Sequence, residues 1–153
     1  MSGLGIAIVI HVLAVVWWIG GLAFVTAVFL PAVRHGLGSD PRAAFYQIEN
    51  RFAPQARIAV LLIGASGLYM LWRLHAWNWL AQASFWWLDA MILYWLLFVL
   101  LLFVLEPAGL LKRAIHGAAD EAGMWRRMQR FHLLMLVIAL IIIGAAAAGT
   151  HGF

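Results

Sequence analysis

The chain has 153 residues, of which 66% are hydrophobic and only 10% charged, and its formal net charge is +4. A mean hydropathy of +0.96 is typical of an integral membrane protein and argues against a water-soluble globular domain. The absence of cysteine excludes disulfides, thiolate metal sites and thiol redox chemistry. Basic loops retained beside anionic lipid explain the isoelectric point near 10.4, so nucleic acid is not expected as a partner.

Four apolar stretches are long enough to cross a bilayer, because a helix needs about 20 apolar residues to span a hydrocarbon core of roughly 30 Å. In chain order they run over Ile6–Leu30, Ile58–Leu74, Phe85–Leu105 and Phe131–Gly149. Spans of this length leave little chain for anything else. We therefore expect one all-α domain over residues 1–153, an integral membrane four-helix bundle.

The connection between the first two spans carries turn and capping signals. In "RHGLGSDPRAAF", Ser39 or Asp40 is a candidate helix cap before Pro41. A short cytoplasmic helix over Pro41–Arg51 is predicted to follow. The connection between the third and fourth spans predicts helical turns around a break at Gly117.

The basic residues predict how the chain is oriented in the membrane. Arg34, Arg42, Arg51 and Arg57 lie between the first and second spans, Lys112, Arg113, Arg126, Arg127 and Arg130 lie between the third and fourth, and Arg73 alone lies between the second and third. Basic loops are retained in the cytoplasm. The pattern predicts a multi-pass protein of the bacterial inner membrane with both termini outside.

Polar side chains inside the spans are candidates for function, because an ionisable group at such depth costs a few kcal/mol unless it is paired or faces a wet cavity. The outer half is expected to hold His11, Met70, Asp89 and Met91, and the inner half Arg57, Glu106 and His132. Hydrogen bonding between helices, such as His11 with Asp89, is the alternative. For the inner group, the alternative is a structural ion-pair network.

Imidazole and thioether are soft ligands that suit both Cu(I) and haem iron. A copper site needs roughly two to four converging ligands, and the sequence has no Met-x-x-Met or His-x-His cluster. Haem needs one or two axial ligands and a large apolar slot, which a helical bundle rich in aromatic residues can supply. Trp18 lies seven residues after His11 on the same helix face, where it could pack against a porphyrin.

The segment "HVLAVVWWIGGLAF" resembles the first-helix signature of the CopD-like and HemJ-like membrane proteins. HemJ-like proteins bind haem b and serve as protoporphyrinogen oxidases, and their functional first-helix histidine matches His11. Their third-helix Trp-x-His-x-Lys pattern falls here on Trp87, Asp89 and Met91. The resemblance therefore implies haem binding through His11. Asp89 and Met91 stand where that pattern has His and Lys, and this difference puts the oxidase activity in doubt. CopD-like proteins are linked to copper uptake or resistance, but this chain lacks a Met-rich outer loop.

These observations predict a haem b-binding membrane protein that acts in electron transfer or in a haem-linked oxidation. His11 is the expected axial ligand, with Asp89 accepting the proton of its other ring nitrogen. Met91 is a second candidate ligand, although residues two apart on a helix point about 200° apart, so Asp89 and Met91 cannot both face the bundle centre. Arg57 is a candidate partner for a haem propionate.

The expected partners are membrane lipid, a second copy of the chain in a homodimer, and a redox partner or quinone. Two alternatives stay open: a copper-binding or copper-transport membrane protein, and a noncatalytic membrane anchor subunit. The sequence assigns no enzyme activity and no catalytic residue.

Overall fold

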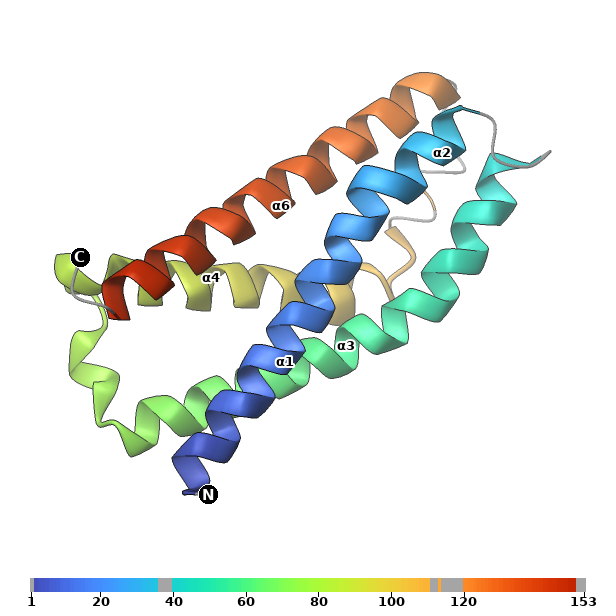
Figure 1. Cartoon of the computed structure of the whole chain (residues 1–153). Coiled ribbons are helices and arrows are strands. Elements are labelled where there is room, and N and C mark those ends of the chain that lie inside the picture. The colour runs from blue at the N-terminus through green and yellow to red at the C-terminus, as the bar shows by residue number, and fades with distance from the viewer. Residues whose placement is uncertain (1, 36–39, 111–112, 114–119, 151–153) are drawn as a thin grey trace.

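The computed structural model describes residues 2–35, 40–110, 113 and 120–150. Within these ranges the chain is helical apart from short turns, and no strand occurs (Figure 1). The elements are α1 (Gly3–Phe24), the π-helical turn η1 (Val25–Phe29), α2 (Leu30–Arg34), α3 (Pro41–Arg73), the 3₁₀ turns η2 (Ala76–Trp79) and η3 (Ala83–Phe85), α4 (Trp86–Leu100), the π-helical turn η4 (Leu101–Leu105) and α6 (Glu121–Thr150).

Among the described residues, four helical stretches are long and apolar enough to cross a membrane, which confirms the predicted all-α, multi-pass class. They are Gly3–Arg34, Pro41–Arg73, Ala83–Leu105 and Glu121–Gly149. Large apolar side chains on their outward faces are exposed, as lipid contact requires: Leu13 is 64% and Leu93 67% accessible.

The start of α3 confirms one sequence prediction and corrects another. The Asp40 carboxylate caps the helix by accepting from the amides of Arg42 at 2.9 Å and Ala43 at 3.1 Å. The expected short helix over Pro41–Arg51 is wrong as a separate element, because α3 continues through Pro54 to Arg73. Proline inside a helix removes one hydrogen bond, and we attribute the continuity of α3 to the burial of its neighbouring residues against other helices.

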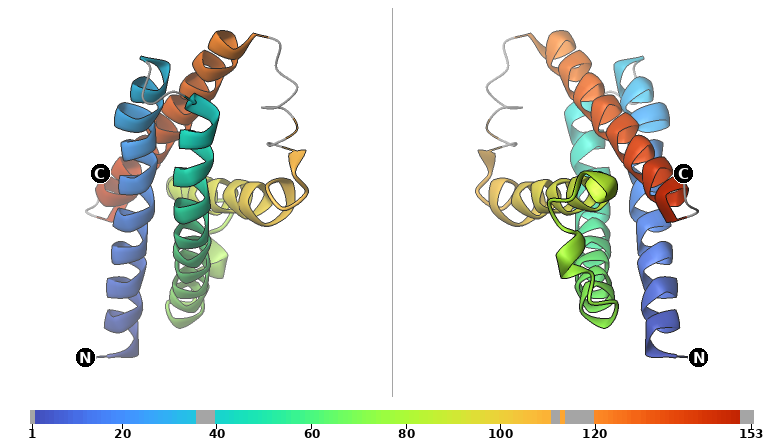
Figure 2. Two further views of the ribbon diagram at one scale, coloured as in Figure 1. Left: turned by 90° about the vertical axis from the view of Figure 1, so that its right-hand side faces the viewer. Right: turned by 90° about the vertical axis from the view of Figure 1, so that its left-hand side faces the viewer.

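Helices α1 and α3 form an antiparallel pair, and α4 lies across them (Figure 2). The start of α1, the end of α6 and the connection from α3 to α4 lie toward one end of the molecule (Figure 1). Helix α2 and the first residues of α3 and α6 lie toward the other end, which we call the basic end because Arg34, Arg42, Arg126, Arg127 and Arg130 belong to it.

The central core is built around three aromatic rings from α1 and α4. Trp18 packs edge-on against Phe98, with ring centroids 4.5 Å apart, and lies 5.7 Å from Tyr94. The Tyr94 hydroxyl donates to the carbonyl of Met135 on α6 at 2.9 Å. The next side chain of α4, Trp95, donates from its indole to a carbonyl of α3. Helix α4 is thereby hydrogen-bonded to both α3 and α6.

The basic end has its own core and its own polar contacts. Phe45 of α3 lies between the rings of Phe29 and Trp125, which come from η1 and α6. Arg42 pairs with Glu121 at 3.4 Å, so α3 and α6 are also joined by charge. These contacts hold together the helices that surround the candidate site.

Candidate functional site

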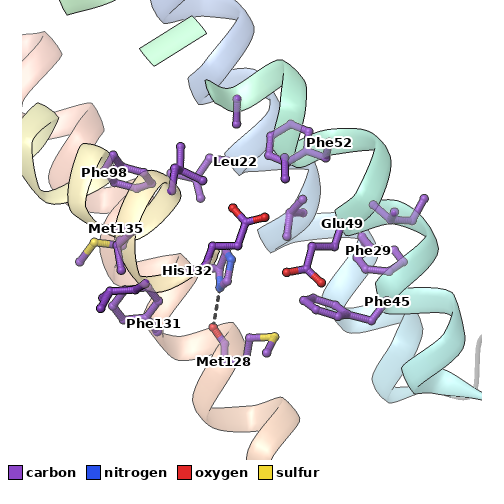
Figure 3. Close-up of a pocket in the computed structure, with 18 of the residues that line it drawn as sticks. Leu22, Phe29, Phe45, Glu49, Phe52, Phe98, Met128, Phe131, His132 and Met135 are labelled. Carbon is purple, nitrogen blue, oxygen red and sulfur yellow. Dashed lines mark hydrogen bonds between the residues drawn. The ribbon is translucent and has the colours of Figure 1, made fainter. Parts of the chain in front are cut away.

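A cavity of about 560 Å³ lies inside the bundle, in the half nearest the basic end. This partly open cavity is lined by α1 with η1, the first half of α3, the end of α4 with η4, and the first half of α6 (Figure 3). Its wall is mainly apolar and aromatic, with rings from Trp18, Phe29, Phe45, Phe52, Phe98 and Phe131. Cavities of roughly 300–1,000 Å³ with such walls are typical small-molecule sites.

Of the residues that the structure describes, the polar side chains that line this cavity are Glu49, Glu106, Arg127 and His132. Figure 3 shows His132 of α6 and Glu49 of α3 extending into the space between the two helices. Arg127 is exposed, so it lies where the cavity meets the surface of the basic end. The cavity therefore has an apolar body and a small number of charged groups, which is the usual composition of a ligand site.

Two π-helical turns, η1 and η4, form parts of the wall. In each, the amide after the turn donates five positions back, from Leu30 to Val25 and, at 2.9 Å, from Glu106 to Leu101. Each amide is followed directly by a proline, Pro31 or Pro107. A proline clashes with the carbonyl four residues earlier, and the wider π turn relieves this clash. The two prolines thus explain why both helices widen beside the cavity.

The π turn η4 leaves one carbonyl without its usual donor. Leu102 would accept from the amide of Glu106 in an α-helix, but that amide bonds to Leu101, and the next residue, Pro107, has no N–H. Arg57 of α3 supplies the donor instead, from Nε at 3.1 Å. The same guanidinium pairs through Nη2 with Glu106 Oε1 at 3.0 Å.

His132 is the candidate iron or metal ligand within the cavity. Its Nδ1 lies 2.9 Å from the carbonyl oxygen of Met128, and a carbonyl can only accept, so Nδ1 carries the proton. In the neutral ring, Nε2 is then unprotonated and keeps the lone pair that a metal needs. A hydrogen bond from the second nitrogen is the usual way in which a ligating imidazole is held.

His11 lies outside this cavity and contacts α3. Its Nδ1 is 3.0 Å from the hydroxyl oxygen of Ser66, which itself donates to the carbonyl of Leu62 at 2.5 Å. The hydroxyl proton is used there, so Nδ1 of His11 is the donor and Nε2 keeps its lone pair. The ring packs beside Gly67, where a Cβ would make an ordinary van der Waals contact, 3.5 Å from Cε1 of His11. The structure therefore gives His11 a role between helices.

Asp89 is not the partner of His11, contrary to the sequence-based expectation. Both oxygens of its carboxylate lie 3.2 Å from the amide of Ala81, in the connection before α4. Ala81 has a positive φ of 59°, a conformation that costs energy in a residue with a side chain. Asp89 belongs to the first turn of α4 and accepts from the amide of Ala81. It therefore stabilises the connecting turn that contains Ala81.

The remaining predicted site residues are separated from one another. Trp18 is buried and lines the cavity, although His11 on the same helix does not. Met91 is partly buried and packs against the central core and against the cluster of Leu71, Ala76 and Leu88 near the opposite end. Arg57 does not itself line the cavity, but it binds two residues that do, Leu102 and Glu106.

Sequence reasoning missed several residues that the tertiary structure brings to the cavity. Glu49 was treated as part of a cytoplasmic helix, and Arg127 only as a topology signal. Met128 and Met135 flank His132 at helical spacing, which places all three on one face of α6. The spacing could have predicted from the sequence that these three side chains share a face, but nothing in the sequence showed that this face borders a cavity.

Comparisons with protein-family models, curated proteins and solved structures give no match to this chain. In the part of the chain that the structure describes, no three His, Cys, Asp or Glu side chains converge as ion ligands. A cofactor that needs one protein nitrogen and a large apolar wall fits the cavity better than an ion that needs several ligands.

Proposed function

We propose that this chain is a membrane protein that binds haem b in the cavity near its basic end and takes part in electron transfer. The supporting observation is the combination found at His132. A cavity of about 560 Å³ with aromatic walls contains an imidazole whose Nδ1 is held by a carbonyl, so that Nε2 is the free ligand atom.

The residues around the cavity fit the parts of a haem. His132 would bind the iron, and rings such as Trp18 and Phe98 would pack against the porphyrin. Arg127, at the exposed edge, would bind a propionate, because a guanidinium matches a carboxylate. Arg57 is less suited to that predicted role, since its guanidinium already binds Leu102 and Glu106. When bound, haem b supplies a one-electron redox centre.

His132, in place of the predicted His11, would then hold the iron. His11 keeps a free Nε2 as well, but it does not line the cavity. We further propose that the basic end faces the cytoplasm of a bacterial cell and that both termini lie outside, because basic residues are retained on the cytoplasmic side. For the copper alternative, no three His, Cys, Asp or Glu side chains converge among the described residues.

The test is an absorption spectrum of the full chain purified in detergent from cells supplied with haem, followed by titration with hemin. Wild-type protein should show a Soret band and, when reduced, resolved α and β bands. His132→Ala should abolish or strongly shift this spectrum. His35→Ala, which changes an exposed histidine, is the matched control and should leave it unchanged.

Two results would count against the proposal. A wild-type protein that stays colourless in excess hemin would reject haem binding and favour copper or a membrane anchor. Loss of the spectrum in His11→Ala, together with an unchanged spectrum in His132→Ala, would reject the cavity and restore His11 as the axial ligand.

A further inference from the structure

Arg57 makes two contacts to one short segment of the neighbouring helix. Its Nε donates to the carbonyl of Leu102 at 3.1 Å, and its Nη2 lies 3.0 Å from Glu106 Oε1. Leu102 belongs to the π turn η4, and Glu106 is the residue whose amide closes that turn. One guanidinium therefore binds both the carbonyl that the π turn exposes and the side chain that follows it.

The π turn leaves the carbonyl of Leu102 without a backbone donor. The turn therefore depends on a donor from another helix, which Arg57 supplies. If the amide of Glu106 shifted to Leu102, the segment would regain an α-helical bond and the carbonyl would be satisfied without Arg57. A buried carbonyl that lacks a donor is costly inside a membrane. An α-helical register would satisfy the carbonyl of Leu102. Because Arg57 already satisfies it, the α-helical register gains no hydrogen bond over the π register here.

We infer that Arg57 is a positioning residue for the cavity: its two contacts hold η4 in the π register and so set the wall formed by Leu101, Leu102 and Leu105. This inference rests on the proposed use of the cavity as a cofactor site. A change of register by one residue rotates the following side chains by about 100°. Leu105 and Glu106 would then turn away from the space that they now line.

The charge of Glu106 gives Arg57 a second purpose in the same arrangement. Among the described residues, Glu106 Oε2 is buried and has no hydrogen-bond partner, so the carboxylate depends on Arg57 for its neutralisation. Truncating one member of such a pair leaves an uncompensated charge. Arginine suits both contacts because its donors form a rigid fork, whereas a lysine ammonium does not hold a carbonyl and a carboxylate in one plane.

The first experiment titrates hemin into purified full-length variants and follows the Soret band. Arg57→Gln should weaken hemin binding about tenfold and shift the band, because the wall that η4 presents to the porphyrin would be lost. Arg57→Lys should restore part of the affinity, because it keeps the charge beside Glu106. Arg51→Gln removes the same charge from an exposed position of α3 and should bind like wild type.

A second measurement does not require haem. The chain has no cysteine, so Leu105→Cys introduces a single thiol at the cavity wall. Its reaction with N-ethylmaleimide should slow several-fold when Arg57→Gln is added, because a side chain turned toward lipid loses the water that thiolate formation needs. Adding Arg51→Gln should not change the rate.

The outcomes separate this inference from the proposed function. If wild type binds no hemin but the thiol still slows with Arg57→Gln, haem binding is wrong and the positioning role stands. If wild type binds hemin, and Arg57→Gln leaves both the affinity and the thiol rate unchanged, the positioning role is overturned. If Arg57→Gln does not accumulate in membranes, Arg57→Lys is used in its place. A wild-type hemin affinity together with a wild-type thiol rate in Arg57→Lys would then overturn the positioning role.

Discussion

Trp18 allows the central packing to be tested against a matched neighbour. Its side chain is 5% accessible and packs against two rings of α4, whereas the preceding residue, Trp17, is 62% accessible on the outward face of α1. Trp18→Ala and Trp17→Ala therefore remove the same indole from adjacent positions, once from the core and once from the lipid-facing surface.

The expected magnitude depends on the unfolded state. In a water-soluble core, replacing tryptophan by alanine costs about 3–5 kcal/mol, much of it from transfer of apolar surface to water. Lipid tails and detergent are as apolar as the core, so that part largely disappears in a membrane. The contacts of Trp18 with Phe98 and Tyr94 remain, at about 0.5–1.5 kcal/mol each. Trp18→Ala should thus lower the free energy of unfolding by about 1–3 kcal/mol.

Unfolding by SDS in mixed micelles, followed by circular dichroism, measures this difference directly. Trp17→Ala should change the free energy of unfolding little, because lipid or detergent replaces its contacts. Equal losses in the two variants would show that the α1–α4 aromatic contact is not part of the native core. A loss well above 5 kcal/mol for Trp18→Ala would show that water, rather than detergent, reaches the unfolded segment.

Two other predictions concern His11 and the orientation of the chain. Ser66→Ala removes the hydroxyl that holds His11. It should lower the free energy of unfolding in the same SDS assay by about 0.6 kcal/mol and by no more than about 1.7 kcal/mol, the range of hydrogen bonds between membrane helices. A larger loss would indicate that His11 has a further role. In intact cells, an impermeant maleimide should label His75→Cys and not His35→Cys, two exposed positions on opposite ends, and the reverse pattern would invert the proposed topology.

Interpretation of the cavity depends on contacts between distant parts of the chain. Glu49 and His132 are 83 positions apart in the sequence and line one cavity because α3 and α6 both begin at the basic end. Asp89 and His11 were expected at matching depths and yet bind different partners. Depth along a span follows from counting residues, whereas the direction in which a side chain points around the helix depends on what packs beside it.

The sequence by itself determined that this chain is helical and is suited to a lipid bilayer. A run of about 20 apolar residues has few alternatives to a membrane helix, because lipid leaves each backbone polar group to be satisfied within the segment. The four spans were readable for this reason. A cap before Pro41 was readable from Ser39 and Asp40, and the structure shows Asp40 in that role. Only the tertiary structure decided that α4 lies across α1 and α3, that Arg57 serves the carbonyl of Leu102, and that the cavity opens beside His132 rather than His11. These features depend on the choice of neighbours, and nearly uniform apolar helices carry little local information about that choice.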